Sequence, residues 1–580
     1  MVGKIYRNII FIQLSISILS LLGSNIDNII VGKFLSAEAL AACGLVMPVV
    51  QMASVLAGVI TTGIKTVCSR SIGAGNKKMA NDQISSAAVF SIITFTAACV
   101  LCYIFIDNIA MGLAGDDMEL FQYVKDFMFG YLLVIPSLGL LSLFIYVLQM
   151  NNQAGYCTGA AVAFIIFNVG FDLLSVFVLD LGLLGIGLST SLSYFIMIGV
   201  LLTGYFRVNT TIRISLKVFR WAYLGDIVKN GLTNAIATGT SMIIKMVVNL
   251  VVLNAAGTDA LAAVTVIVSF AGILLSVSKA IAYCTDMTSG MFYGERNVKE
   301  LKNTVYTFVK YSVIFNLCIA AIVAATSEYC CLLFINAEEV AYPMAVSALR
   351  WFSLCMVFFS VSDCFVYFLL GIKKPGYAYF LAALINLSLG AYSALLIPIW
   401  MVDGAALAYV FGYFTVFCLI IVFFCIRNKS NPFNPATYLV LPKNFEIPND
   451  HIFEYLLENQ DDVIFMSQRV SDFCKRFEDN MRNRMAISLV IEELGMNVIE
   501  HGMKKNKKYL FEIRVVYDEE NKSWIVRSRD DCKEFNPVKY LEMHESGDKT
   551  GSLGIGLVLK LAKHAQYYNT MGLNNLVVEF

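Results

Sequence analysis

Long apolar runs separated by short polar connections dominate the first 430 residues of the chain. About twelve of these runs reach the ~20 residues that a helix needs to cross a bilayer. They fall near residues 9–31, 42–66, 84–106, 127–150, 157–179, 184–206, 230–254, 260–286, 305–326, 344–370, 377–399 and 405–426. A mean hydropathy of +0.69 and a charged fraction of 15% agree with this pattern. The sequence therefore predicts an all-α polytopic membrane domain.

The pattern changes after residue 428. Residues 429–449 are rich in proline and asparagine and are typical of a linker. Residues 450–580 hold about half of the charged residues and all four histidines. Their periodicity indicates helices near 450–460, 464–479 and 481–501, strands at 508–517 and 523–528, and a last strand at the C-terminus. We expect a small α/β sandwich domain here.

Lysine and arginine gather on every second connection between the predicted helices, for example at Arg70, Lys77 and Lys78. By the positive-inside rule, both termini and the α/β domain lie in the cytoplasm, at a bacterial-type inner membrane. The first apolar run is too long for a signal peptide and is the first transmembrane helix. A net charge of zero gives no indication of nucleic-acid binding.

The membrane domain contains an internal repeat. Ala39-Leu40-Ala41-Ala42 recurs 221 positions later at 260–263, and Gly73 and Asn76 recur as Gly294 and Asn297. Six helices followed by six in the same orientation predict two lobes, about residues 1–210 and 225–428. Such lobes are typical of transporters that rock around a central site.

Polar residues inside the first lobe are the strongest candidates for a functional site. Asp27 lies in the first predicted helix, and Asn168 and Asp172 share one face of the fifth because they are four residues apart. Carboxylates in a membrane span are expensive and are usually kept for ion or substrate handling. Two carboxylates close together repel each other, so either a cation binds between them or a proton neutralises one of them. The alternatives are a carboxylate at a helix end and an internal hydrogen-bond network.

The loop and helix motifs of both lobes resemble the MATE (multidrug and toxin extrusion) family over roughly residues 5–428. They are GKFLSAEALAACGL (32–45) and SRSIGAGNKKMA (69–80), with second-lobe counterparts NAAGTDALAAVTV (254–266) and SGMFYGERNVKELK (289–302). The resemblance implies exchange of Na⁺ or H⁺ for small organic, often cationic, compounds. It also implies a cation site made by Asp27, Asn168, Asp172 and Thr190.

The remaining charged residues of the membrane domain indicate a function less clearly. Asp363 lies where another MATE branch has a carboxylate, and it could bind a cationic substrate with Lys245 nearby, or pair with Lys245 or Arg350; we favour pairing. Lys65 and Asp286 are also 221 positions apart, and we expect them to approach each other when the cytoplasmic side closes.

The C-terminal domain carries polar and glycine positions in a recognisable order. Glu493, Asn497 and His501 share a helix face because they are spaced by four. Asp530 follows a strand, and Gly551, Gly554 and Gly556 precede a helix, where a glycine-rich turn can hold phosphate.

This order resembles the GHKL ATPases, and within them the anti-sigma-factor serine kinases. The resemblance implies that ATP and Mg²⁺ bind, with Asn497 as Mg²⁺ ligand, Glu493 as catalytic base and Asp530 on adenine, and with Gly551, Gly554 and Gly556 around the phosphates. An anti-sigma or anti-anti-sigma protein would then be a partner. Cys532 departs from the family pattern, which has glycine there, and adenine binding is weakened if that position needs a glycine conformation.

The expected function is a cation-coupled antiporter for small organic, drug-like compounds, with an ATP-binding regulatory domain. A Walker A motif is absent from the sequence, so ATP is not expected to drive transport. Two alternatives stay open: a membrane receptor whose tail is a serine kinase or a partner-binding module, and a flippase for lipid precursors.

Overall fold

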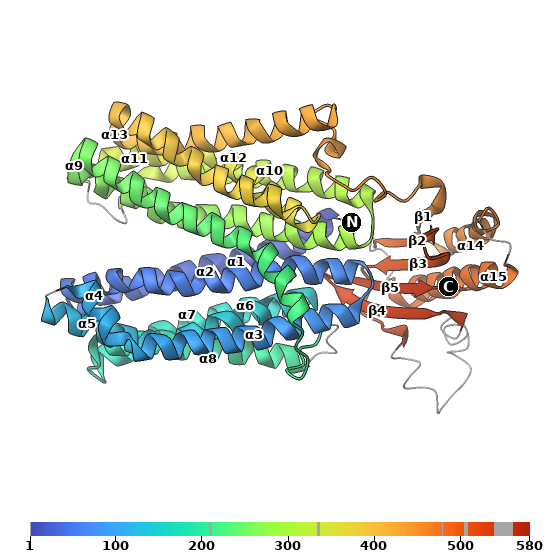
Figure 1. Cartoon of the computed structure of the whole chain (residues 1–580), viewed down its shortest axis with the longest axis horizontal. Coiled ribbons are helices and arrows are strands. Elements are labelled where there is room, and N and C mark those ends of the chain that lie inside the picture. The colour runs from blue at the N-terminus through green and yellow to red at the C-terminus, as the bar shows by residue number, and fades with distance from the viewer. Residues whose placement is uncertain are drawn as a thin grey trace.

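The computed structural model describes residues 2–115, 117–207, 212–332, 337–477, 480–503, 509–538 and 561–580. A long helical bundle carries a smaller α/β domain at one end (Figure 1). We call this end of the bundle the proximal end and the opposite end the distal end. The N-terminus lies near the proximal end (Figure 1).

The bundle has two lobes. The first contains α1 (Val2–Phe34), α2 (Ala37–Gly73), α3 (Lys77–Ile104), α4 (Ile106–Ala114), α5 (Met118–Tyr131), α6 (Val134–Met150), α7 (Ala154–Phe177) and α8 (Gly182–Arg207). The second contains α9 (Trp221–Gly294), α10 (Val298–Leu332), α11 (Ala341–Ser353), α12 (Cys355–Gly371) and α13 (Pro375–Asn428). The helical geometry breaks at Gly257 in α9 and at Met401 in α13.

Within the described residues, nine helices are long and apolar enough to cross a membrane, or ten if the bent pair of α11 and α12 is one span. This count takes α13 as one helix of 54 residues, although it breaks at Met401. It also omits the 33-residue α1. Counting α1 and each half of α13 as well gives twelve long helical segments among the described residues, the number that the sequence predicts.

The backbone confirms the repeat of 221 positions. Left-handed residues recur at this interval as Gly75 and Arg296, Asn152 and Lys373, and Asp180 and Met401. Helix caps recur in the same way, because Asn76 accepts a hydrogen bond from the backbone N–H of Met79 and Asn297 accepts one from that of Glu300. The two lobes are therefore built to one plan.

The lobes are in contact at the proximal end. Gly73 of α2 packs on the backbone of Met291 in α9, and Gly294 packs on the backbone of Arg70, with no room for a side chain at either glycine. The Arg70 guanidinium crosses between the lobes, donating from Nε to the carbonyl oxygen of Gly371 (3.0 Å) and from Nη2 to Oδ1 of Asn230 (2.8 Å). The proximal end is closed.

The C-terminal domain consists of a five-stranded antiparallel sheet and a helical layer. Its elements are η2 (Asn449–His451), β1 (Ile452–Leu456), α14 (Gln460–Cys474), α15 (Met481–Asn497), η3 (Val498–Gly502), β2 (Phe511–Asp518), β3 (Ser523–Asp530), β4 (His564–Thr570) and β5 (Leu573–Glu579). The strand order is β1-β2-β3-β5-β4. The helix predicted near 450–460 is wrong, because residues 452–456 pair with β2 as the edge strand β1. This apolar run is so short that its pattern fits a helix as well as a strand, and pairing with a neighbouring strand decides between them.

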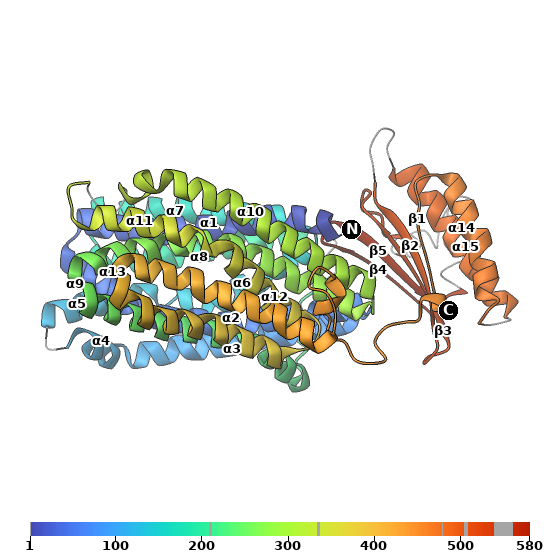
Figure 2. The same cartoon turned by 90° about the horizontal axis from the view of Figure 1, so that it is seen from above.

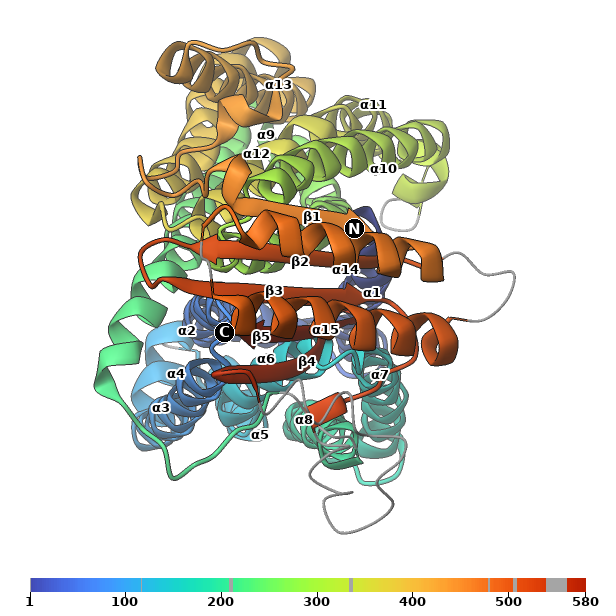
Figure 3. The same cartoon turned by 90° about the vertical axis from the view of Figure 1, so that its right-hand side faces the viewer.

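The sheet lies between its own helices and the bundle (Figure 2). Figure 3 shows α14 and α15 side by side over one face of the sheet. Ile513, Val515 and Val526 of the sheet belong to one buried core with residues of both helices. The opposite face points toward the proximal end of the bundle. The segment predicted as a linker packs on the second lobe, where Phe445 stacks on Tyr293 with ring centroids 4.6 Å apart.

Candidate functional sites

The polar residues predicted as a cation site come together in the first lobe. Asp27 of α1, Asn168 and Asp172 of α7, and Thr190 of α8 face one another. Thr190 Oγ1 donates to Asp27 Oδ2 at 3.3 Å. Asn168, Asp172 and Thr190 are buried, so three helices place four oxygen-bearing side chains in one buried cluster.

Several polar atoms of this cluster have no hydrogen-bond partner in the part of the chain that the structure describes. They are Oδ1 of Asp27, both amide atoms of Asn168 and both carboxylate oxygens of Asp172. Buried polar groups are nearly always satisfied in proteins. Carboxylate, amide and hydroxyl oxygens suit a hard cation, and the donor set therefore fits Na⁺ or a proton.

The repeat shows that this cluster belongs to one lobe. The positions 221 residues after Asp27, Asn168 and Asp172 hold Val248, Leu389 and Ser393. Val248 and Leu389 are buried apolar residues of the core. The second lobe thus has the same fold at these positions without the carboxylates.

The ion pairs predicted for Asp363 are absent from the described residues. Arg350 pairs instead with Glu328, from Nη2 to Oε1 at 2.8 Å. Asp363 is half-buried on α12 with Oδ2 unpartnered in the described chain, and Lys279 supplies the cationic charge that acts on it. The Lys245 side chain is exposed on α9.

Lys65 and Asp286 lie near each other across the lobes, but the direct contact is made by a neighbour. Thr66 Oγ1 donates to Oδ1 of Asp286 at 2.8 Å. The Lys65 ammonium lies over the ring of Tyr283, 4.1 Å from its centroid. Lys65 and Asp286 do approach each other, close enough for their charges to interact, and the adjacent Thr66 makes the hydrogen bond.

The C-terminal domain has a cavity of about 370 Å³ between α15, η3 and the ends of β3 and β5. Asn497 and Asp530 both line it, together with His501. The helix changes to a π-helix at Val498–Gly502, a feature often found at functional sites. Glu493 is half-buried one turn earlier, and its carbonyl oxygen accepts a hydrogen bond from the Asn497 amide at 2.6 Å.

Asp530 is held at the end of β3. Its Oδ1 accepts from Nδ2 of Asn574 (2.8 Å) and from the backbone N–H of Cys532 (2.9 Å). Burial raises the pKa of Asp530, and these two hydrogen bonds oppose the shift. The sequence did not single out Asn574, because only strand pairing places β5 beside β3.

Cys532 occupies the glycine position of the family pattern without a left-handed backbone, since the left-handed non-glycine residues of the described chain lie elsewhere. A methyl group on Gly502 would lie 3.1 Å from Cβ of Cys532 and 3.2 Å from its Sγ. The absence of a side chain at Gly502 therefore makes space for the side chain of Cys532. Gly551, Gly554 and Gly556 lie outside the described residues.

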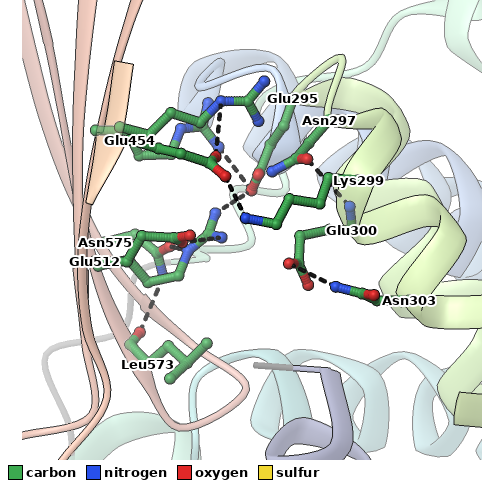
Figure 4. A network of polar contacts seen from close by, with 12 residues as sticks. Glu295, Asn297, Lys299, Glu300, Asn303, Glu454, Glu512, Leu573 and Asn575 are labelled. Carbon is green, nitrogen blue, oxygen red and sulfur yellow. Dashed lines mark hydrogen bonds and ion pairs between the residues drawn. The ribbon is translucent and has the colours of Figure 1, made fainter. Parts of the chain in front are cut away.

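A network of charges that sequence reasoning missed joins the two domains (Figure 4). Glu295, directly after α9, pairs with Arg527 and Arg529 of β3. Burial alone would raise the pKa of Glu295, but the two arginines outweigh it and hold the pKa below its ordinary value. The spacing of Arg527 and Arg529 places both side chains on one face of the sheet, but it does not tell that an acidic residue of the bundle covers this face.

Two family models match the chain. One described as MatE matches residues 14–174 and 234–392, which together exceed half of the chain. One described as histidine kinase-like ATPase domain matches residues 458–580. No curated protein sequence matches.

Solved structures share the fold of the bundle. An outward-facing multidrug resistance MATE family transporter of the MOP superfamily has 20% sequence identity and a TM-score of 0.69, covering 74% of this chain and 97% of that chain. A MATE structure in complex with MaL6 gives the same identity and TM-score, with 74% and 98% covered. A MOP superfamily transporter from Pyrococcus furiosus, described as having a binding pocket of reverse polarity, has 20% identity and a TM-score of 0.66, with 72% and 95% covered.

Proposed function

Because the chain belongs to the MatE family of membrane transporters and carries a C-terminal histidine kinase-like ATPase domain, we propose that it exports small organic compounds in exchange for Na⁺ or H⁺. The observation that carries the proposal is the buried cluster of Asp27, Asn168, Asp172 and Thr190, with its unpartnered oxygens. The multidrug relatives that share its fold support the class of substrate.

The cluster couples transport to a cation through charge. With Asp27 and Asp172 close together in a medium of low dielectric constant, an added cation or proton neutralises their repulsion. Tyr131 and Tyr194 lie near enough to interact with the charge of Asp27. Since α1, α7 and α8 each contribute a side chain, binding changes how these helices pack and so the balance between the two conformations.

We place the proximal end and the C-terminal domain in the cytoplasm. Arg70, Lys77 and Lys78, and Arg296 and Lys299 in the second lobe, all lie at this end, as the positive-inside rule requires. The closed proximal end then corresponds to a conformation that faces outward.

The cavity of the C-terminal domain is proposed to bind ATP with Mg²⁺ in a regulatory role. Asp530 is oriented by Asn574 to accept a hydrogen bond from an adenine amine. The Asn497 amide, anchored on the carbonyl oxygen of Glu493, would hold Mg²⁺. Bound ATP would supply a charged polyphosphate. A serine-kinase activity with Glu493 as base, and an anti-sigma type partner, belong to the same proposal.

Substrate efflux from proteoliposomes under an imposed Na⁺ or H⁺ gradient tests the antiporter. Wild type is compared with Asp27→Asn and Asp172→Asn, using a fluorescent organic cation. We expect gradient-driven efflux to fall to the background level in both variants. Asp180→Asn is the matched control, because this carboxylate is exposed at the distal end and asparagine tolerates its left-handed backbone. Efflux that survives both substitutions would contradict the proposed site.

A receptor is the second candidate, favoured by the buried charge network that joins the C-terminal domain to both lobes. Ligand-dependent phosphorylation of a protein partner, without gradient-driven transport, would favour this reading. Titration of the full chain with ATP and Mg²⁺, with Asn497→Ala as control, tests the nucleotide site that both candidates share.

A further inference from the structure

The face of the sheet opposite α14 and α15 touches both lobes of the bundle. On the first lobe, Arg527 donates from Nη2 to the carbonyl oxygen of Gly73 at 3.0 Å. The backbone N–H of Lys77 donates to Oε1 of Gln566 at 3.3 Å, and Lys4 of α1 forms an ion pair with Asp531.

On the second lobe, the contacts centre on Glu295. Its side chain is only 2% exposed, and its Oε1 lies 2.6 Å from Nη1 of Arg527 and also contacts Arg529. Around this core, Lys299 pairs with Glu454 of β1 (Figure 4). The pairs of Glu295 with Arg527 and Arg529 are taken out of water, so removing one partner leaves the other buried and uncompensated, whereas the Lys299 side chain stays largely exposed.

The single side chain of Arg527 therefore contacts both lobes. One nitrogen of its guanidinium binds the first lobe at Gly73 and another binds the second lobe at Glu295. The guanidinium is planar and rigid, so both contacts can form only while Gly73 and Glu295 stay close together.

Apolar contacts reinforce the docking. Tyr568, Met571 and Leu573 of the C-terminal domain belong to the same buried cluster as the core of the bundle. This area is removed from water only while the domain rests on the bundle.

The two docking points lie on equivalent connections of the repeat, with the second-lobe contacts at Glu295 and Lys299 offset by one residue. Gly73 and Lys77 correspond to Gly294 and Val298, so the domain holds the same connection in each lobe, immediately after α2 and after α9. These connections lie where the lobes must separate for the proximal end to open.

We propose that the C-terminal domain is a clamp that holds the proximal ends of the two lobes together. Undocking of its sheet is then required before the proximal end opens. The inference rests on the proposed alternation of the transporter between two conformations, and it assigns the domain a mechanical role that ATP hydrolysis does not need to drive.

Hydrogen-exchange mass spectrometry of the full chain in lipid nanodiscs tests the clamp. The variants are Arg527→Met, in the domain, and Glu295→Gln, in the bundle. Arg469→Met is the matched control, since this arginine lies exposed on α14 in the outer layer, where it covers the ring of Phe465.

We expect both interface variants to raise exchange by about tenfold or more in the peptides that end α2 (67–77) and α9 (287–297), because a buried charge loses its partner. Arg469→Met should leave these peptides unchanged. Raised exchange in β3 with both bundle peptides as protected as in the wild type would overturn the clamp.

The design separates undocking from misfolding and from loss of transport. Glu295→Gln changes no residue of the C-terminal domain, so its result decides the question even if Arg527→Met unfolds that domain and α15 loses protection. The readout needs neither substrate nor gradient. If the protein proved to transport nothing, the proposed function would be wrong, but hydrogen exchange would still decide whether the domain acts as a clamp.

Discussion

Gly73 of α2 and Met291 of α9 are in direct backbone contact between the lobes, and a side chain at Gly73 would overlap with the carbonyl group of Met291. Gly294 and Arg70 make the same contact from the other lobe. The closed proximal end thus depends on two glycines that the repeat places at equivalent positions.

Gly73→Ala should open the proximal end. Backbone atoms cannot move aside as a flexible side chain can, and overpacking of this kind costs about 1–3 kcal/mol, or about thirtyfold in population at the middle of that range. Hydrogen exchange at residues 67–77 and 287–297 should rise accordingly. Gly155→Ala is the control, because nothing lies within 4 Å of its added methyl group. Unchanged exchange in Gly73→Ala would show that the lobes adjust without separating.

Asn168→Leu should abolish cation binding without destabilising the protein. Neither amide atom of Asn168 has a hydrogen-bond partner among the described residues, and an unsatisfied buried polar group costs about 1–3 kcal/mol. The Tm without added cation should therefore stay constant or rise. In the wild type, adding Na⁺ or lowering the pH should raise the Tm, because a ligand at a hundred times its Kd stabilises the folded state by about 2.7 kcal/mol. This increase in Tm should disappear in Asn168→Leu.

Asn386→Leu is the contrasting control for that experiment. Its amide donates to Thr240 Oγ1 at 2.9 Å and to the carbonyl oxygens of Ala237 and Ala382. It should lower the Tm and leave the cation-dependent increase intact. A fall in the Tm of Asn168→Leu as large as that of Asn386→Leu would identify Asn168 as part of an internal hydrogen-bond network.

Gly502→Ala should weaken ATP binding through Cys532. Its added methyl group would lie 3.1–3.2 Å from the Cys532 side chain, at the wall of the cavity. We expect a loss of affinity of about fivefold or more in the full chain with Mg²⁺, from an overpacking cost of about 1 kcal/mol or more. Cys532→Gly should recover most of the loss in the double variant. Equal losses in both backgrounds would mean that the two side chains do not compete for space.

Docking of the C-terminal domain should be insensitive to pH near neutrality and should weaken in acid. Arg527 and Arg529 lower the pKa of Glu295 against the effect of burial. A group whose pKa is depressed in the docked state contributes its stability above its ordinary pKa, and this is lost as the pH falls through the depressed value. Energy transfer between unnatural fluorescent residues at positions 78 and 469, both exposed, would follow the docking.

Glu295→Gln provides the reference for the pH experiment. Its side chain is neutral at every pH, so energy transfer should be low throughout and should show no transition in acid. A wild-type transition near neutral pH would indicate that a group other than Glu295 controls the docking.

The sequence by itself determined the two domains, the repeat and the members of the buried polar cluster in the first lobe. Apolar runs of spanning length have few alternatives to membrane helices, and buried carboxylates such as Asp27 and Asp172 stand out because they are costly. A spacing of four placed Asn168 and Asp172 on one helix face, and the structure brings that face to α1 and α8. These features depend on local periodicity or on composition, which a single sequence carries.

Only the tertiary structure decided which charges meet. Arg527 and Arg529 lie more than 230 positions from Glu295, and the hydrogen bond to Asp286 comes from Thr66, the neighbour of Lys65. Residues 452–456 form a strand because β2 supplies their hydrogen bonds. Such contacts depend on the packing angle of helices and on the pairing of strands, where a shift by one residue changes the partner. The docking of the sheet on both lobes has the same origin, since no local pattern in either domain specifies the surface of the other.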